Sequence, residues 1–149
     1  YFTKLLSDGR TYGETLLDPT HIYVGLIQDC LECGIDIHYA VNITGHGWRK
    51  LMRAPQSFIY IVEQLPTQQQ IFGVLQKQGR ITDEEMYSTF NMGAGFALYL
   101  SESDVSTVCS IASTLGFRAL YAGHIEEGDK KVIIKPNGLE FSGETLKIR

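Results

Sequence analysis

Two short glycine-containing segments hold the residue types and spacing best suited to binding a ligand. Residues 44–47 read TGHG and residues 91–95 read NMGAG, so each segment carries two glycines separated by one residue. In the first segment the missing side chains would let backbone amides approach a bound anion, and the helix start expected after it adds partial positive charge. Three basic residues follow within two turns and could complete such an anion site: Arg49, Lys50 and Arg53.

Each segment also has a purely structural interpretation. The first could be a tight turn that needs positive φ, with the basic residues on a solvated helix face. In the second, close approach to another backbone element, or a bulge at the start of a strand, competes with close approach to a ligand. Both segments lie at the end of a regular element, where ligand sites gather, so we expect them to share a cleft. No Ser-His-Asp, paired-carboxylate or Walker-type pattern competes with them, and no catalytic residue is assigned.

Hydrophobic periodicity and helix-capping signals predict the elements that position these segments. Asp18 and Pro19 begin a predicted helix that Gly34 ends, and Thr82 with Glu85 forms the capping box of another. The predicted helices are 19–33, 48–54, 67–79 (closed by Gly79), 82–90 and 102–115 (closed by Gly116). The predicted strands are 35–43, 57–63, 95–101, 117–127 and 130–138, the last two joined as a hairpin at Gly128-Asp129.

Apolar residues within these elements predict which faces are buried. The helix 19–33 carries a stripe of Ile22, Tyr23, Leu26, Ile27 and Cys30, and the helix 102–115 carries Val105, Val108, Cys109, Ala112 and Leu115. The strand 35–43 alternates with a period of two, which predicts one buried face of Ile35, Ile37, Tyr39, Val41 and Ile43. The irregular order of helices and strands, together with the closing hairpin, predicts an α+β fold with a mixed, largely antiparallel sheet and helices packed on it.

Composition limits the classes of function. The chain has 149 residues, 44% hydrophobic and 20% charged, so it is the size of one domain with its own core. A net charge of -4 and a pI near 5.5 argue against nucleic acid or an anionic membrane as a partner. No apolar run approaches the roughly 20 residues that span a bilayer. We expect a cytoplasmic protein, and the start at Tyr1 without Met leads us to expect part of a longer chain.

The cysteines and histidines give little support for redox or metal chemistry. Three cysteines are too few for a disulfide scaffold, and the lone Cys30-x-x-Cys33 pair falls at the end of a predicted helix, where the dipole disfavours a thiolate. A zinc site would need two further ligands, and no second pair stands at ligand spacing among the histidines. We therefore expect structural packing of the cysteines and no metal held by this chain alone.

Three motifs, taken together and in order, resemble those of a known family. YGETLLDPTHIYV, residues 12–24, is similar to LGExLLxPTRIYV; VNITGHGWRKLMR, residues 41–53, is similar to xHITGGGxxxNxPR; and residues 86–95 resemble MYxTFNMGxG. These are motifs of aminoimidazole ribonucleotide synthetase, also called phosphoribosylformylglycinamidine cyclo-ligase. They cover most of residues 9–100, and related synthetases share the domain plan without the MYxTFNMG segment.

The resemblance implies a fold, a reaction and a set of binding residues. It implies that residues 1–149 are one domain of the type found at the C-terminus of the family, and that an N-terminal domain outside this chain dimerises and binds most of the ATP and Mg²⁺. The implied reaction phosphorylates the formyl amide oxygen of formylglycinamidine ribonucleotide with ATP, and a nitrogen then closes the imidazole ring of purine biosynthesis. The residues implied to bind substrate or phosphate are Thr44, Gly45, His46, Gly47, Asn91, Gly93 and Gly95.

Three departures from the family motifs keep other functions open. Asn42 stands where the family has His, His46 replaces the middle glycine of its loop, and His21 replaces the Arg of PTRIYV. An imidazole at position 46 could add a hydrogen bond or a group that titrates near pH 6.5, or it could simply fill space. The alternatives are a diverged ATP-dependent synthetase acting on another amide or carboxylate, and a non-catalytic binding or interaction module. For the isolated chain we expect no turnover.

Overall fold

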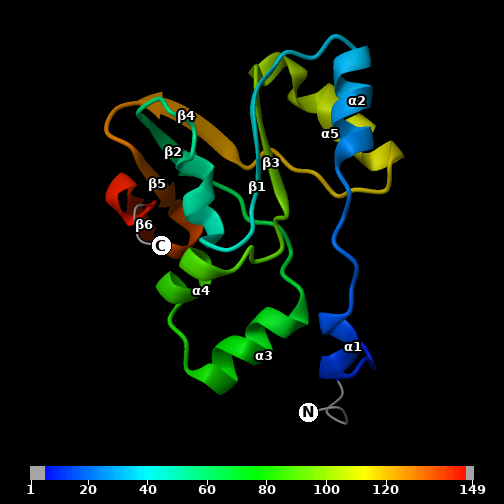
Figure 1. Cartoon of the computed structure of the whole chain (residues 1–149), viewed down its shortest axis with the longest axis vertical. Helices are drawn as coiled ribbons and strands as arrows, with labels where there is room; N and C mark the ends of the chain where they lie inside the picture. Colours follow the sequence, from blue (N-terminus) through cyan, green and yellow to red (C-terminus); the bar gives the residue numbers. More distant parts are fainter. Residues whose placement is uncertain (1–5, 147–149) are drawn as a thin grey trace.

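The computed structural model describes residues 6–146, in which six strands form two separate sheets (Figure 1). The strands are β1 (Ile37–Asn42), β2 (Phe58–Val62), β3 (Phe96–Leu100), β4 (Gly123–Glu127), β5 (Lys131–Ile134) and β6 (Leu139–Ser142). β1 pairs with β3, and the other four follow the order β4-β2-β5-β6. Every pairing is antiparallel except β2 with β5. The predicted α+β class with mixed, largely antiparallel pairing is confirmed, but its strands are divided between two sheets.

Helices surround these sheets, and most lie where periodicity predicts them. The α-helices are α1 (Tyr12–Leu16), α2 (Val24–Glu32), α3 (Gln70–Gly79), α4 (Asp83–Thr89) and α5 (Val105–Thr114). The 3-10 helices are η1 (Gly47–Met52), η2 (Glu102–Asp104), η3 (Lys135–Asn137) and η4 (Gly143–Leu146). In residues 6–146 no helix is both long enough and apolar enough to cross a membrane.

The predicted hairpin between β4 and β5 is wrong, because β2 lies between them. Phe58 pairs with Glu127 on β4, while Ile59 pairs with Lys131 on β5. The connection therefore spans two inter-strand spacings, roughly 10 Å, which residues 128–130 can cover when extended. It passes the start of β2, where the Ser57 hydroxyl donates a hydrogen bond to the Gly128 carbonyl at 3.1 Å. Turn residues in a sequence reveal a reversal of direction, but not whether a third strand occupies the space.

A register shift divides the predicted buried face of the first strand in two. Ile37 pairs with Leu100, whereas Tyr39 pairs with Tyr99, so His38 is an extra residue on β1. Such a bulge moves the following side chains to the other face of the sheet. Ile35 and Ile37 accordingly pack with the cluster under α2 and α5, and the later apolar residues of β1 pack toward the four-stranded sheet.

Two hydrophobic clusters cover the two faces of the β1–β3 sheet. The smaller one lies under α2 and α5, which run side by side in Figure 1, and its buried members are Leu26, Cys30, Ile35, Val108 and Ala112. The larger one joins β1–β3 to η1, α4 and the four-stranded sheet. Five expected core residues lie outside both clusters: Ile22, which is 79% exposed, Leu115, which is 39% exposed, and Ile27, Val105 and Cys109.

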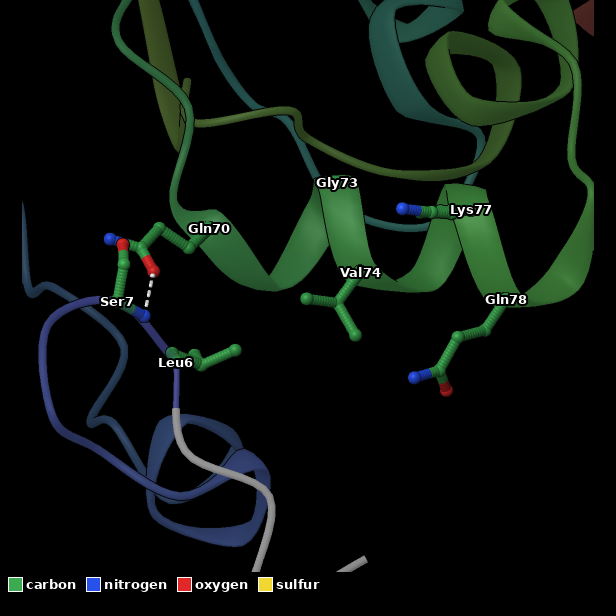
Figure 2. A pocket seen from close by; sticks show the side chains of 7 residues that line it. All are labelled: Leu6, Ser7, Gln70, Gly73, Val74, Lys77 and Gln78. Atoms are coloured by element: carbon green, nitrogen blue, oxygen red, sulfur yellow. Dashed lines mark hydrogen bonds between the residues drawn. The ribbon is translucent and has the colours of Figure 1, made fainter.

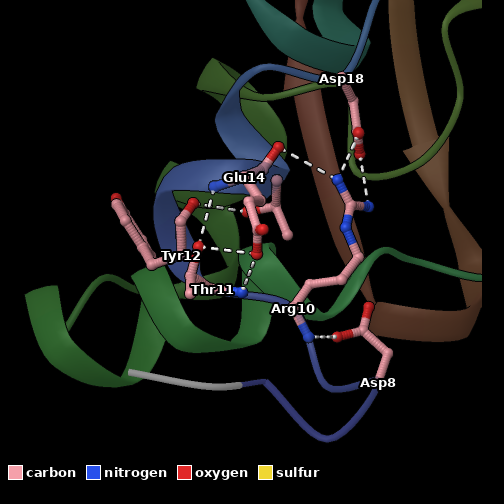
Figure 3. Close-up of polar contacts among 7 residues, drawn as sticks. Asp8, Arg10, Thr11, Tyr12, Glu14 and Asp18 are labelled. Carbon is pink, nitrogen blue, oxygen red and sulfur yellow. Dashed lines mark hydrogen bonds and ion pairs between the residues drawn. The ribbon is translucent and has the colours of Figure 1, made fainter. Parts of the chain in front are cut away.

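The helix predicted to begin at Pro19 begins at Val24 instead. Asp18 does not cap it, because the Arg10 guanidinium binds both oxygens of the Asp18 carboxylate (Figure 3). This ion pair lowers the pKa of Asp18. Residues 18–23 have no regular secondary structure, and the predicted stop at Gly34 is confirmed by its left-handed φ of +75°.

Capping residues set three further helix ends, at α4, α3 and α1. Thr82 caps α4, since its hydroxyl accepts a hydrogen bond from the Glu85 amide at 3.2 Å. The predicted capping box is confirmed only in this half, because in the described residues the Glu85 side chain does not bond back to the Thr82 amide. The predicted stop at Gly79 is displaced by one residue, because Arg80 takes the left-handed conformation that ends α3. Thr11 and Glu14 form a complete capping box on the short helix α1, visible in Figure 3.

Candidate functional site

The strand pairing brings the two glycine segments together. Residues 44–47 follow the end of β1, and residues 91–95 precede the start of β3. Since these strands are antiparallel neighbours, both segments lie at the same end of the sheet. The Ile43 amide donates to the Gly95 carbonyl at 2.9 Å, and the Trp48 indole Nε1 donates to the Asn91 carbonyl at 2.9 Å. The two loops are therefore one connected structure, as their positions at element ends led us to expect.

A cleft of about 1610 Å³ opens beside these loops and runs between the two sheets. Five of the seven predicted binding residues line it: Thr44, Gly45, Asn91, Gly93 and Gly95. His46 and Gly47 are not among its lining residues. The cleft is also lined by most of β2, by the whole of β3 and by residues 117–125. Its volume exceeds the roughly 300–1,000 Å³ typical of a small-molecule pocket, so a ligand at the glycine loops would occupy only part of it.

Contacts with the protein itself account for three of the four glycines. A Cβ at Gly47 would lie 2.1 Å from the Tyr87 carbonyl oxygen, and one at Gly93 would lie 2.8 Å from the Thr67 carbonyl oxygen. Both also have left-handed φ, +51° and +95°. A Cβ at Gly95 would lie 2.2 Å from the Tyr23 hydroxyl. These values favour the structural interpretation at the three positions.

Gly45 differs from the other three glycines. No atom lies within 4 Å of a Cβ built there, its φ is not left-handed, and the residue is exposed and lines the cleft. The absent side chain at this position leaves open space beside the backbone. Of the four glycines, Gly45 is the one at which room for a ligand is the simpler explanation.

The three basic residues after the first loop have different surroundings. The Arg49 guanidinium donates to the carbonyls of Ser88 at 2.9 Å and Thr145 at 3.0 Å, and more weakly to that of His46. It therefore ties η1 to α4 and η4, and its hydrogen-bonding capacity is directed at the protein. An anion site completed by Arg49 is not supported by these contacts.

Lys50 contacts the first loop through a side chain of that loop. Its ammonium group donates a hydrogen bond to the Thr44 hydroxyl. Burial, and then the charge of Arg53, lowers the pKa of Lys50. Within residues 6–146 no carboxylate forms an ion pair with either cation. Two neighbouring positive charges without a carboxylate beside an open glycine loop suit an anionic group.

The three residues that depart from the family motifs lie in different places. Asn42 and His21 line the cleft, and the His21 ring meets the Phe117 ring edge-on at 5.6 Å. His46 has a left-handed φ of +79°, and its Nδ1 lies 3.0 Å from the Gly45 carbonyl oxygen. Two of the three changes therefore alter the wall of the cleft itself.

The cysteine pair lies where the sequence predicts, at the end of α2. Cys30 is fully buried in the smaller cluster, where burial raises its pKa, and Cys33 is exposed. This arrangement favours the structural interpretation over thiolate chemistry. In the described part of the chain no group of three or more His, Cys, Asp or Glu side chains could hold a metal ion.

A second, smaller hollow of about 440 Å³ lies between residues 6–7 and α3 (Figure 2). The Ser7 amide donates to the Gln70 side-chain oxygen at 2.9 Å across it. None of the predicted binding residues lines this hollow. The predicted binding residues that line a hollow therefore all line the larger cleft.

The fold and the cleft define the class of this protein as an α+β domain with a large cleft beside two glycine loops at one end of a two-stranded sheet. No protein-family model matches the chain. Curated relatives do match it over nearly its whole length, and their names agree. The chain is a relative of the phosphoribosylformylglycinamidine cyclo-ligases and corresponds to part of their length.

Three of these relatives illustrate the match. The phosphoribosylformylglycinamidine cyclo-ligase of Methanococcus maripaludis is 35% identical over 95% of this chain and 38% of its own. That of Methanothermobacter thermautotrophicus is 37% identical over 97% of this chain and 40% of its own, and that of Fusobacterium nucleatum is 34% identical over 90% of this chain and 40% of its own. The resemblance predicted from the motifs is confirmed, and the chain spans about two fifths of the length of these relatives.

Proposed function

We propose that this chain is the C-terminal domain of an ATP-dependent cyclo-ligase that converts formylglycinamidine ribonucleotide to aminoimidazole ribonucleotide in purine biosynthesis. The observation that carries the proposal is the open Gly45 loop, with Lys50 and Thr44 in contact beside it, in a chain similar to cyclo-ligases over 95% of its length. In this role the loop binds a phosphate of the substrate or nucleotide.

The proposal assigns separate tasks to the residues of the site. The Lys50 ammonium supplies charge, and the Thr44 hydroxyl and the backbone beside Gly45 supply hydrogen bonds to the phosphate. Asn91, Gly93 and Gly95 shape the adjoining wall. ATP supplies the phosphoryl group that turns the formyl amide oxygen into a leaving group. An N-terminal domain binds most of the ATP and the Mg²⁺.

The proposal extends to the protein in which this domain works. Residues 1–149 form one domain, and an N-terminal ATP-binding domain dimerises and closes over the cleft. The size of the cleft, about 1610 Å³, supports this arrangement because it leaves room for more than a nucleotide. We infer a cytoplasmic protein that binds neither nucleic acid nor membrane, which the acidic balance of this chain supports.

A chimaeric enzyme tests the proposal directly. This chain replaces the corresponding segment of the Methanococcus maripaludis enzyme, and formation of aminoimidazole ribonucleotide is measured. We expect turnover by the chimaera and none by the chain alone. A Lys50→Met chimaera serves as the control for the loop. A folded chimaera that binds an ATP analogue but neither binds nor converts formylglycinamidine ribonucleotide would exclude this function.

A diverged synthetase is the second candidate, because the changes at His21 and Asn42 line the cleft. It would use the same loop for phosphate but accept a different amide or carboxylate. Restoring the family residues with His21→Arg and Asn42→His distinguishes the two functions. If the double variant gains conversion of formylglycinamidine ribonucleotide that the original lacks, the original is the diverged enzyme.

A further inference from the structure

We propose that Tyr23 is a ligand-contacting residue of the cleft, whose hydroxyl donates a hydrogen bond to a phosphoryl oxygen of the ligand held at the glycine loops. This inference rests on the proposed function and adds a residue from outside both loops. Tyr23 lies at the start of α2, far in sequence from residues 91–95, and it lines the same cleft as they do.

The hydroxyl end of Tyr23 is the part that meets the second loop. A Cβ at Gly95 would lie 2.2 Å from the Tyr23 hydroxyl oxygen, 3.3 Å from ring atom Cζ and 3.7 Å from Cε2. The contact thus falls off from the hydroxyl toward the ring. The absence of a side chain at Gly95 lets this hydroxyl lie over the loop backbone, on the wall of the cleft.

Neighbouring rings hold Tyr23 in this position. Its ring stacks on Phe96 with centroids 4.7 Å apart and planes 10° apart. On another side it meets Phe117 with centroids 5.4 Å apart at an angle of 34°. A hydroxyl fixed by such contacts loses little conformational freedom when a ligand binds, so its hydrogen bond contributes more to affinity.

The Tyr23 hydroxyl also has unused hydrogen-bonding capacity. No group in residues 6–146 bonds to it, whereas the Tyr99 hydroxyl donates to the Leu51 carbonyl at 2.8 Å and the Tyr87 hydroxyl accepts from Gln68 at 2.8 Å. Burial raises the pKa of Tyr23, so the phenol keeps its proton at neutral pH. The residue therefore presents an unpaired donor at the loop, and a phosphoryl oxygen is a strong acceptor.

Replacing the hydroxyl while keeping the ring tests the inference. Isothermal titration compares the wild-type chain and Tyr23→Phe with three probes: formylglycinamidine ribonucleotide, a non-hydrolysable ATP analogue and inorganic phosphate. Loss of one hydrogen bond predicts about 3- to 10-fold weaker binding of the probe that reaches the loop. The midpoint of thermal unfolding should not change, because the ring contacts remain.

Tyr121→Phe is the matched control, since Tyr121 lines the same cleft and is 38% exposed. We expect this variant to bind every probe as the wild type does. Binding by Tyr23→Phe within twofold of wild type, equal weakening in the control, or no probe bound by the wild type would each overturn the inference. A different result contradicts the proposed function, namely binding of phosphate or the ATP analogue without binding of formylglycinamidine ribonucleotide. In that case the affinities of Tyr23→Phe and wild type are still compared with the probe that binds, so the inference about Tyr23 is tested separately.

Discussion

The two glycine segments have the same spacing but different reasons for it. In residues 44–47, Gly45 faces open space while Gly47 is pressed against the backbone of α4. In residues 91–95, Gly93 is pressed against the backbone at Thr67 and Gly95 lies under the Tyr23 hydroxyl. One segment therefore offers a free edge to a ligand, and the other is mainly a joint that lets protein elements meet.

A G-x-G pattern does not by itself reveal why the side chains are absent. In these two segments a carbonyl oxygen lies close at Gly47 and Gly93 and a phenol lies close at Gly95, whereas Gly45 faces open space. Substitution tests this difference, because the four positions should respond very differently to one added methyl group.

Gly47→Ala should have the largest effect. The added Cβ would lie 2.1 Å from the Tyr87 carbonyl oxygen at a left-handed φ, and α4 cannot move away without leaving the larger cluster. We expect a loss of about 3 kcal/mol or more in the free energy of unfolding, measured by urea titration. A loss below about 1 kcal/mol would mean that the contact between Gly47 and the α4 backbone can relax.

Gly93→Ala should destabilise by about 2 kcal/mol. Its Cβ would lie 2.8 Å from the Thr67 carbonyl oxygen and it too has left-handed φ, but Thr67 lies in a segment without regular structure that can shift. The same urea titration measures the change. The decisive result is which variant loses more free energy of unfolding. A larger loss for Gly93→Ala than for Gly47→Ala would contradict the tighter backbone contact at Gly47.

Substitution of Arg49 should lower the stability of the fold, whereas substitution of Lys50 should lower the affinity for phosphate. Arg49→Met removes hydrogen bonds to the Ser88 and Thr145 carbonyls, so we expect about 2 kcal/mol less stability and unchanged phosphate affinity. Lys50→Met should leave stability within about 0.5 kcal/mol and weaken phosphate binding about tenfold. Thermal unfolding and isothermal titration of both variants provide the test. If Arg49→Met loses affinity and Lys50→Met does not, the assignment of the cation is wrong.

Gly45→Ala should have the smallest effect on stability. Nothing lies within 4 Å of the added Cβ and its φ suits any residue, so we expect a change within about 0.5 kcal/mol. Because the methyl group enters the cleft, the affinity for phosphate should fall. Unchanged affinity at unchanged stability would remove Gly45 from the binding site.

Much of the local structure follows from the sequence because it depends on neighbouring residues. The alternating run before Thr44 gives β1, Thr82 caps α4, and Gly34 and Gly116 end the helices before them with left-handed φ. The family resemblance was also carried by short motifs, and the relatives confirm it.

The failures fall where distant residues compete with local signals. Asp18 and Pro19 form a good helix start, but the carboxylate binds Arg10 and the helix begins at Val24. Periodicity places Tyr23 in an apolar helix stripe, and no pattern in the sequence indicates that its hydroxyl lies against Gly95. Arg49 looks like any basic residue beside a glycine loop until its carbonyl partners are known.

The sequence alone determined the α+β class, the positions of most elements, the relationship to the cyclo-ligases and the two segments that approach one cleft. Only the tertiary structure decided that β2 separates β4 from β5, that a bulge at His38 turns β1 from one core to the other, and that Gly45 is the open glycine. The reason is physical: propensity, capping and periodicity act between residues close in the chain, whereas these features depend on which distant backbone or side chain occupies the neighbouring space.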